Sequence, residues 1–529
     1  QAGTNFTNSL LVGTSSTGTL SSADGNTGVG IEAFSSLTSG DNNTAVGFAA
    51  LCDNTTGTSN TAFGKTALVR NTTASCNTAV GMNSLFTNTT GASNTSVGIC
   101  ALFANTTGIE NVGVGSLSLD ANTTGDYNVA VGANSLSTNT TADNNTAIGV
   151  AALRDNTTGT ENVAVGRSAL LVNTTGASNT AVGCGSLDAN TTAAQNSAFG
   201  YEALGANTTG TRNVAIGSSA LTTNTTANCN VAVGVCSLKV NTTGEENTAV
   251  GSASMITNTT GNANVALGFC AMKFNTTGCS NVAVGNVALC KNTTACYNTA
   301  VGSDALKAQT TGISNVSVGY FSLVASTTGA CNVAVGVQAG DSVTSGICNV
   351  GVGAFALSAV TTGGSNTSLG SRAGNSTTTG GNNLSLGLAA NPTSATVSNQ
   401  MTLGNSSNDT LRSNVTSISS LSDRRDKKNI EDIPHGLDYI LAMRPVKFDW
   451  DRRDGTMLDR KDYGFIAQEL DEVQEKFGNK EYTRLVLKDN PDRLEADPMK
   501  TYPILIKAIQ ELSKENKDLK SRIEALESN

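Results

Sequence analysis

Short apolar runs and polar turns alternate along most of the chain, and the pattern returns at a fixed interval. The phrase N-T-A-V-G-x-x-A-L-x-x-N-T-T-G-x-x recurs end to end, with a 17-residue period. The glycine that closes its first half stands at 24 positions, from Gly13 to Gly404, without an insertion or a deletion. Loops of globular proteins tolerate changes of length. A period this strict therefore indicates that each copy is stacked on the next one.

The first half of each copy has the alternation of a short β-strand. Thr44 and Val46 share one face of this strand, and Ala45 lies on the other face. Val46 and Leu51 recur as columns of bulky apolar side chains. We expect a coil of stacked turns to bury both columns.

Asparagine and glycine are expected at the corners of each turn, because both accept a positive φ. The segment Asn54–Gly57 is such a corner. A second asparagine, four residues before the glycine, recurs from Asn26 to Asn383, with Ser9 and Gln400 in its place at the two ends. We expect the side chains of this second column to form an amide ladder along the axis.

The fold class predicted for residues 1–408 is mainly β, a β-solenoid or β-roll rod of 17-residue turns. Turns about 4.8 Å apart would give a rod on the order of 115 Å long. One such turn encloses little volume, so we expect three chains to associate as a homotrimer. The columns of Ala50 and Leu51 would then be buried at a shared axis. A solenoid wound from a single chain is the alternative.

The repeat resembles two known kinds of fibre. The motif N-x-A-x-G, as in Asn162–Gly166, is similar to the head repeats of trimeric autotransporter adhesins. The whole 17-residue unit resembles arrays in the tail-fibre proteins of phages and algal viruses. This resemblance implies a fibre architecture, and it leaves the ligand open.

Charge divides the chain sharply. There are 28 charged residues before position 419 and 45 from there to the end, which predicts a linker at 409–421 and a separate domain at 422–529. The net charge of −9 argues against a nucleic-acid partner. No run of about twenty apolar residues is present, which argues against insertion into a membrane. We expect neither a metal nor a cofactor.

All twelve cysteines lie in the repeat. Cys279 with Cys296, and Cys331 with Cys348, are each one period apart, which is within the reach of a disulfide. For these two pairs we favour the interpretation that the cysteines are small buried apolar residues. The remaining cysteines, such as Cys52, Cys100 and Cys236, are interpreted as substitutions at tolerant positions. The recurring Asn-Thr-Thr triplets, such as Asn88–Thr90, satisfy the N-glycosylation pattern. Their regular position in a turn explains them equally well.

The last hundred residues have the pattern of a small α+β domain. Residues 445–450 (Pro-Val-Lys-Phe-Asp-Trp) alternate as a half-buried strand does, Asp454-Gly455 marks a turn, and residues 463–470 predict a strand that leads into a helix. A C-terminal helix is predicted at about 502–527. Its apolar residues follow the three-and-four spacing of a coiled-coil seam. The seam positions are Ile509, Leu512, Asn516, Leu519, Ile523 and Leu526. The alternative is an amphipathic helix that packs on its own domain.

These landmarks resemble the intramolecular chaperone auto-processing domain of endosialidases and other phage tail spikes. The opening pattern S-D-x-R-x-K-x-N-I matches at Ser422, Asp423, Arg425, Lys427, Asn429 and Ile430. The segments Pro-Val-x-Phe-x-Trp and Tyr-Gly-Phe-Ile-Ala-Gln-Glu-Leu match as well. One departure is Gln474, where the family usually has proline. We expect it to affect a local turn rather than the chemistry.

The resemblance implies a self-cleaving serine endopeptidase that acts in cis. Ser422 would be the nucleophile and Lys427 its general base, with Asp423, Arg425 and Asn429 in support. A lysine serves as a base only where desolvation lowers its affinity for the proton. The bond expected to break joins Leu421 to Ser422, and the bond between Ser422 and Asp423 is the second candidate. A triad around the only histidine, His435, is a weak alternative.

The predicted function is a virion tail fibre that attaches to a host cell. Its partners would be two further copies of the chain and a host surface receptor, with a glycan as one candidate. The C-terminal module would trimerise, direct folding of the rod and be released after cleavage. A trimeric cell-surface adhesin and a glycan-degrading tail spike are the alternatives.

Overall fold

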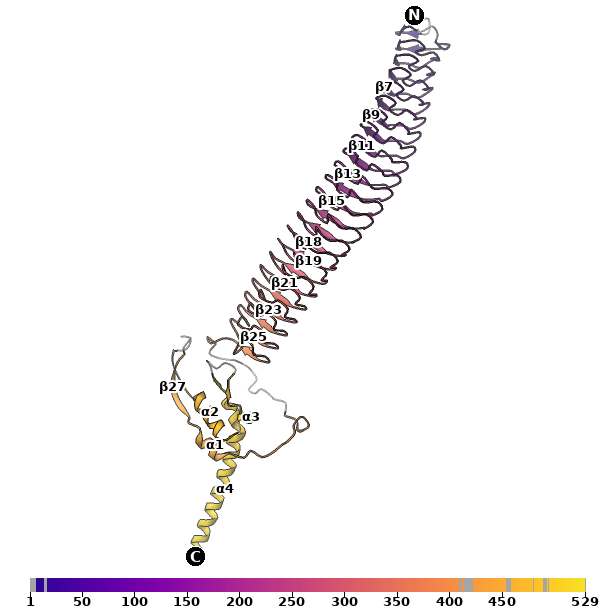
Figure 1. Cartoon of the computed structure of the whole chain (residues 1–529). Helices are drawn as coiled ribbons and strands as arrows, with labels where there is room; N and C mark the ends of the chain where they lie inside the picture. The colour runs from indigo at the N-terminus through magenta and orange to yellow at the C-terminus, as the bar shows by residue number, and fades with distance from the viewer. Residues whose placement is uncertain are drawn as a thin grey trace. The chain divides into compact units, whose positions relative to one another are not determined.

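The computed structural model describes residues 6–13, 17–408, 412, 422–452, 458–478, 480–488, 492 and 494–528 (Figure 1). The chain divides into two compact units, Gln1–Ile347 and Cys348–Asn529. The predicted linker at 409–421, apart from Arg412, lies outside the described residues, as does the predicted turn at Asp454-Gly455. The domain boundaries proposed from the sequence therefore stay a prediction.

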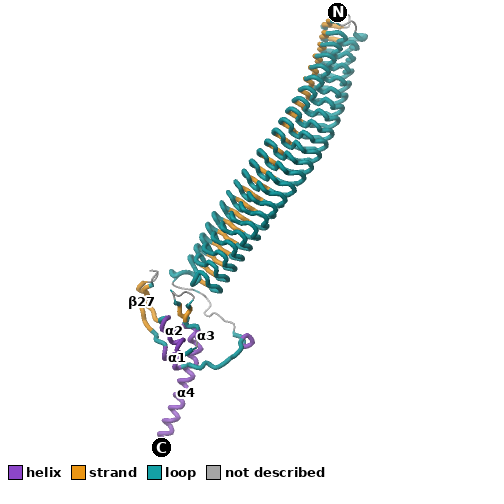
Figure 2. Tube along the Cα trace, in the orientation of Figure 1, coloured by secondary structure: helices purple, strands orange, loops and turns teal. Residues whose placement is uncertain are grey.

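The first unit is a parallel β-solenoid, as the repeat predicts. Each short strand pairs with the strand one turn away at a 17-residue offset, for example Thr44 with Thr61 and Ala45 with Ala62. Strands make up only a small part of each turn, and loops make up the rest (Figure 2). The prediction of a 17-residue-repeat β-solenoid is confirmed.

The strands of the first unit begin with a short parallel pair, β1 (Phe6–Thr7) and β3 (Ala23–Asp24). The solenoid strands up to residue 182 are β2 (Leu10–Val12), β4 (Thr27–Val29), β5 (Thr44–Val46), β6 (Thr61–Phe63), β7 (Thr78–Val80), β8 (Thr95–Val97), β9 (Val112–Val114), β10 (Val129–Val131), β11 (Thr146–Ile148), β12 (Val163–Val165) and β13 (Thr180–Val182). The following strands are β14 (Ser197–Phe199), β15 (Val214–Ile216), β16 (Val231–Val233), β17 (Thr248–Val250), β18 (Val265–Leu267), β19 (Val282–Val284), β20 (Thr299–Val301), β21 (Val316–Val318) and β22 (Val333–Val335).

The inside of the coil is filled by small and medium side chains of the same chain. Ala45, Ala50 and Leu51 are fully buried within a single chain. The expectation that three chains are needed to cover the Ala50 and Leu51 columns is therefore wrong, because one 17-residue turn already closes around them. Val46 is only half-buried, so its predicted burial is also wrong. Because Ala45 points inward, the neighbouring Thr44 and Val46 must point outward.

The corners differ from the prediction in the residues that carry a positive φ. Ala49, Leu51 and Ser59 have φ values of 53°, 50° and 58°, whereas Asn54 has no positive φ. A left-handed conformation destabilises an ordinary residue by about 1–2 kcal/mol. The backbone bonds between turns offset this strain; Leu51, for example, donates its N–H to the carbonyl of Ala67 at 3.1 Å.

The recurring glycine is required by the close stacking of neighbouring turns. Gly166 has a φ of +132°, and a Cβ added there would lie 2.6 Å from the carbonyl oxygen of Gly183. A side chain at this position would push two turns apart. The unbroken glycine column in the sequence follows from this contact.

The predicted amide ladder is confirmed. The backbone N–H of Asn43 donates to Oδ1 of Asn26 at 2.9 Å, and Nδ2 of Asn43 donates to the carbonyl of Gly57. The residues that replace asparagine at the two ends continue the pattern. Ser9 Oγ accepts the N–H of Asn26, and Gln400 donates its N–H to Asn383.

The second unit begins with further turns of the same kind. Its strands β23 (Val350–Val352), β24 (Thr367–Leu369), β25 (Leu384–Leu386) and β26 (Met401–Leu403) pair in parallel, again at a 17-residue offset. Residues 422–528 then form the small module whose charged composition set it apart in the sequence.

The module contains short helices and hairpins. Its elements are the 3-10 helix η1 (Arg424–Asp426), α1 (Leu437–Ala442), β27 (Val446–Asp451), β28 (Leu458–Gly464), α2 (Ala467–Lys476), α3 (Lys480–Thr483), β29 (Val486–Leu487), β30 (Glu495–Ala496), the 3-10 helix η2 (Pro498–Thr501) and α4 (Tyr502–Glu527). β27 pairs with β28, and β29 pairs with β30, both antiparallel. The alternating strand at 446–450 and the helix at 502–527 are confirmed.

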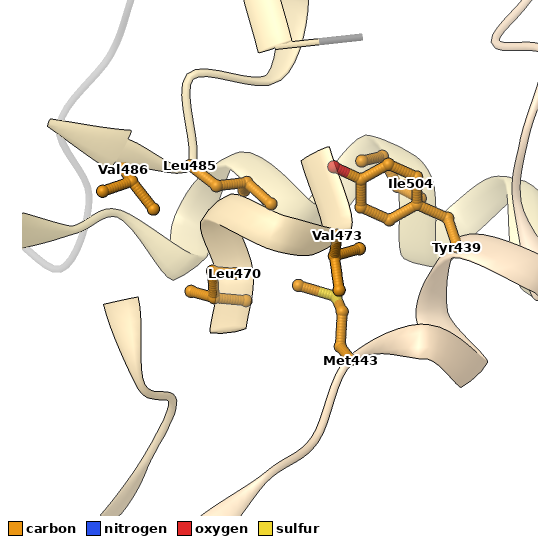
Figure 3. Packing of buried hydrophobic residues seen from close by; sticks show 7 residues of the cluster. All are labelled: Tyr439, Met443, Leu470, Val473, Leu485, Val486 and Ile504. Carbon is orange, nitrogen blue, oxygen red and sulfur yellow. The ribbon is translucent and has the colours of Figure 1, made fainter. Parts of the chain in front are cut away.

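The hydrophobic core of the module draws on segments far apart in the sequence (Figure 3). Its buried members are Tyr439, Met443, Leu470, Val473, Leu485, Val486 and Ile504. Helix α4 contributes Ile504 to this core, and Ala508, one turn later in the same helix, is also buried. Glu511 of the same helix accepts the N–H of Leu437 at 2.6 Å and so caps the start of α1. The described helices include none that is long and apolar enough to cross a membrane.

Candidate functional site

The site predicted from the sequence lies at the beginning of the module, in a tight turn. The side chain of Asp423 caps η1 by accepting the N–H of Arg425 at 2.8 Å. The N–H of Lys427 donates to the carbonyl of Arg424 at 3.1 Å and closes the turn. The chain thereby folds back on itself, and residue 427 comes close to residue 422.

The structure brings Ser422 and Lys427 together. Nζ of Lys427 donates a hydrogen bond to Oγ of Ser422 at 2.5 Å. This contact is the one that a Ser-Lys dyad requires, because the base must reach the proton of the nucleophilic hydroxyl. For catalysis this hydrogen bond must reverse its direction, so that a neutral Lys427 amine accepts the proton of the Ser422 hydroxyl.

Asp423 and Arg425 form an ion pair beside the dyad. Two nitrogen atoms of Arg425 reach the carboxylate, the shorter contact being 2.6 Å. The Arg425 guanidinium lowers the pKa of the Asp423 carboxyl, and the carboxylate raises the pKa of Arg425. Both residues are exposed. Their visible effect is to fix the turn that presents Lys427 to Ser422.

Of the two remaining residues of the predicted site, the structure describes Asn429 but not Leu421. Asn429 lies just beyond the dyad with a φ of +54° and ends the tight turn. Leu421, on the other side of the expected scissile bond, lies outside the described residues.

Water reaches the dyad freely in the single chain. Ser422, Lys427 and every residue between them are exposed. An exposed ammonium is a poor base, because water stabilises its charged form. The described residues of one chain therefore supply the proximity that the chemistry needs but not the desolvation.

His435, the alternative catalytic residue, packs within the module. Nδ1 of His435 lies 3.0 Å from Oδ2 of Asp438, and the ring of His435 contacts Phe477. Among the described residues, no group of three or more histidine, cysteine or acidic side chains could hold a metal ion.

The departure at Gln474 has a different consequence from the one expected. Gln474 lies inside helix α2 and is buried, so the expectation of a local turn is wrong. Its Oε1 accepts the N–H of Leu485 at 3.1 Å, and its Nε2 donates to Asp471 at 2.8 Å. A proline would lack both contacts.

The asparagines of the Asn-Thr-Thr triplets form a second buried ladder. Asn88 is fully buried, and its Nδ2 donates to Oδ1 of Asn71 at 3.0 Å and to the carbonyl of Gly91 at 2.9 Å. A glycan on this nitrogen would replace one of its two hydrogens, so Nδ2 could no longer make both bonds. The position of the triplet in the turn therefore accounts for the pattern, and the folded rod leaves no room for sugar there.

The cysteines are free thiols, and most of them are not buried. The interpretation of the two cysteine pairs as small buried residues is wrong, because Cys279 and Cys296 are partly exposed and Cys331 and Cys348 are exposed. The two buried cysteines are Cys270 and Cys290. The scattered exposed cysteines include Cys76 and Cys229.

Sequence reasoning missed an exposed apolar stripe along the solenoid. The stripe consists of the residues directly before and after the recurring glycine, as in Val46-Gly47-Phe48. Large apolar side chains are about half exposed at many of these positions. Examples are Phe48, Phe63, Ile99, Tyr201, Phe269 and Tyr320. The signal was present in the alternation of the strand, whose outward face carries valine instead of polar residues.

Comparison with known proteins finds one related family. Residues 422–479 match the model of a peptidase family described as the chaperone of endosialidase. Searches of the curated proteins and of the solved structures give no significant match. The matched segment begins at Ser422 and includes Lys427 and the core helix α2. The C-terminal module is thus similar to the self-cleaving chaperone of endosialidase, and together with the 17-residue-repeat solenoid it fits a tail-fibre protein of the endosialidase type.

Proposed function

We propose that this chain is a host-attachment fibre of a virion whose C-terminal module directs folding and then cuts itself free. The family match supports the chaperone role, and the stacked turns support the role of a rod. The observation that carries the proposal is the hydrogen bond between Lys427 and Ser422 at the start of the matched segment.

The expected reaction begins with the hydroxyl of Ser422. Lys427, once neutral, removes the hydroxyl proton while Oγ attacks the carbonyl carbon of Leu421. Ser422 supplies the nitrogen of the same peptide bond, so the attack forms a five-membered ring. The ring opens to an ester as the nitrogen takes the proton back from Lys427. Water then hydrolyses the ester and leaves a new amino terminus at Ser422.

Cleavage should depend on assembly. The dyad of the single chain is exposed, and a lysine base needs an environment poor in water. Two further copies of the module could cover Ser422 and Lys427. Such coupling would delay the cut until the module has assembled.

The exposed stripe beside the glycine column supports association of the rods. Val46, Phe63 and Tyr201 belong to it, the last two with 56% and 54% of their surface exposed. The position before the glycine is apolar in every turn, and large exposed apolar patches mark interaction surfaces. Homotrimerisation would bury it without changing the fold of each chain.

Helix α4 supports the same assembly. Beyond Glu511 the helix has no buried residue, and its seam residues are exposed. Ile509 and Leu519 expose 60% and 52% of their surface. Asn516 sits in this seam and donates to the carbonyl of Leu512 at 3.0 Å. A three-stranded coiled coil would cover the seam, and Asn516 would help to fix its register.

The repeat explains why such a module is needed. A shift of one turn between chains would preserve nearly every contact, so the rod alone specifies its register poorly. Each turn also contains strained residues such as Leu51, so an isolated turn is unfavourable. A module that aligns three chain ends would set the register and seed the stacking. Its removal would then trap the folded fibre kinetically.

The test is the intact mass and the N-terminal sequence of the products from the full chain. We expect a fragment that begins at Ser422, and we expect Ser422→Ala and Lys427→Ala to stay uncleaved. Lys428→Ala is the matched control, because Lys428 is an adjacent exposed lysine. Normal cleavage of the Lys427→Ala chain would refute the dyad.

Attachment needs a separate assay. The cleaved rod, incubated with candidate host cells, should bind them. The same rod, incubated with sialylated glycans, should leave the glycans intact. Hydrolysis would favour a glycan-degrading spike, and binding between the cells that produce the protein would favour an adhesin.

A further inference from the structure

Four of the twelve cysteines lie in two adjacent turns of the solenoid. Cys279 and Cys296 are one period apart and stack directly on each other. The backbone N–H of Cys279 donates to Sγ of Cys296 at 3.0 Å. A hydrogen bond to the thiol of Cys296 raises the pKa of the Cys279 thiol. The backbone of Cys279 and the thiol of Cys296 are therefore in direct contact between turns.

In several other turns a side-chain oxygen occupies the position of the Cys296 sulfur. The N–H of Thr58 donates to Oγ of Ser75 at 3.0 Å, and the N–H of Thr211 donates to Oδ1 of Asn228 at 2.7 Å. A thiol keeps the geometry of this contact but accepts hydrogen bonds weakly. What cysteine adds, when it stands in both turns, is redox chemistry.

Oxidants can reach this pair. Cys279 and Cys296 are both partly exposed, whereas Cys270 and Cys290 of the same two turns are buried, with 8% and 7% of their surface exposed. Neighbouring strands are about 4.8 Å apart, within the range of Cα separations that a disulfide spans.

The pair also lies beside a fault in the rod. The ladder of the Asn-Thr-Thr triplets ends at Asn292, where the next two turns have Gln309 and Ser326 instead. The buried atoms Oδ1 of Asn292, Oε1 of Gln309 and Oγ of Ser326 have no hydrogen-bond partner among the described residues. This ladder is therefore interrupted from the turn that contains Cys296 onward, whereas the other asparagine ladder continues through Asn298, whose N–H donates to Oδ1 of Asn281 at 2.9 Å.

We propose that oxidation joins Cys279 to Cys296 in a disulfide that staples these two turns beside the fault. The oxidant is a small-molecule disulfide. The thiolate of Cys296 attacks one sulfur of the oxidant and releases one thiol, which forms a mixed disulfide. Cys279 then loses its proton and attacks Sγ of Cys296, and the second thiol leaves. Two cysteines are oxidised and one small disulfide is reduced.

The staple would act after folding. In a reducing cell the turns can still separate and correct their stacking, whereas outside the cell the bond holds them together. This order of events rests on the proposed function of an extracellular fibre. The disulfide itself does not depend on cleavage or attachment, so it can fail or succeed independently of them.

The test uses the purified full chain and oxidised glutathione as the oxidant. Peptide mapping after alkylation of the remaining thiols should find Cys279 linked to Cys296, with Cys270 and Cys290 alkylated only after denaturation. Amide exchange over residues 279–297 should slow about tenfold or more on oxidation, because the bond restricts local opening. Dithiothreitol should restore the original rate.

Two variants separate the staple from simple thiol oxidation. Cys296→Ser should fold, since Ser75 makes the same contact, and its Cys279 should carry glutathione instead of a cross-link. Cys229→Ser removes an exposed cysteine elsewhere and should leave the slowing unchanged. Separate glutathione adducts on Cys279 and Cys296 in the parent chain, or a link from either to another cysteine, would overturn the proposal.

Discussion

The rod and the C-terminal module are stabilised in different ways. In the rod every turn repeats the same contacts, and side-chain ladders such as Asn26 to Asn43 run along its length. In the module a single core gathers residues from distant segments, such as Tyr439 and Ile504. The rod is therefore strongly held but ambiguous in register, whereas the module has one arrangement only. A repetitive fibre gains from a unique domain at its end because the two properties are complementary.

The largest difference in stability between the two regions should come from replacing a glycine. Gly166→Ala places a Cβ 2.6 Å from the carbonyl oxygen of Gly183 and forces two turns apart. We expect the rod to lose roughly 3–5 kcal/mol of unfolding free energy. Gly478→Ala in the module is the control, because Gly478 also has a positive φ but nothing lies within 4 Å of the added Cβ. It should destabilise the module by only about 1 kcal/mol. Equal losses in denaturant titrations would contradict the close stacking.

The module should respond to the loss of a single buried amide. Gln474→Ala leaves the N–H of Leu485 without its partner and should destabilise the module by about 1–3 kcal/mol. Gln468→Ala, on the exposed side of the same helix, should change little. The fluorescence of Trp450, the only tryptophan, reports unfolding of the module. An equal loss of stability in Gln468→Ala would contradict the stabilising role of the buried Gln474 amide.

The rod should gain stability where its ladder is repaired. Gln309→Asn would let Nδ2 donate to Oδ1 of Asn292, as Asn292 donates to Asn275 at 2.7 Å. Satisfying this buried oxygen should add about 1–2 kcal/mol. Gln195→Asn, at an exposed position, is the control and should be neutral. Thermal unfolding followed by circular dichroism measures the change, and a destabilised Gln309→Asn rod would show that the ladder is not limiting there.

Acidification should change the stability of the rod and that of the module in opposite directions. These are the smallest effects that we expect. Burial raises the pKa of Asp120 and Asp188 in the rod, so the folded rod takes up protons and gains stability as pH falls from neutral towards about 4. In the module, Arg444 lowers the pKa of Glu469, and Lys488 lowers that of Asp471. Their stabilisation is present above about pH 4 and is lost as pH falls through the lowered values.

Thermal scans between pH 7 and pH 3 check these signs. Circular dichroism follows the rod and Trp450 fluorescence follows the module. Parallel shifts of the two transitions would break the contrast between them.

Much of the rod was predictable because every turn makes the same contacts with its neighbours. The period, the strand of Thr44 to Val46 and the ladder of Asn26 could all be read from the sequence, since each is a column of identical or similar residues. The inward side of the strand was not, because alanine and valine are both apolar and only the small volume of the coil selects Ala45. The positive φ of Leu51 was also hidden, since tertiary stacking overrides the preference of the residue.

The candidate site was predictable in part. The pattern from Ser422 to Asn429 identified the residues, and the turn capped by Asp423 brings Lys427 to Ser422. Its exposure could not be foreseen, because burial depends on which surfaces cover the turn. The contact of Gln474 with Leu485 was missed for a related reason, since it joins residues that only the folded module brings together.

The most direct test of the account asks whether the module sets the register between rods. A photo-crosslinking amino acid in place of Tyr201, in the exposed stripe, can be mapped by mass spectrometry on assembled chains. With the module intact, we predict cross-links to the same turn of the neighbouring chain. With Leu512→Glu and Leu519→Glu in the seam of α4, we predict cross-links spread over offsets of one or more whole turns. The same in-register cross-links in the parent protein and in the Leu512→Glu, Leu519→Glu variant would contradict the claim that the module aligns the fibre.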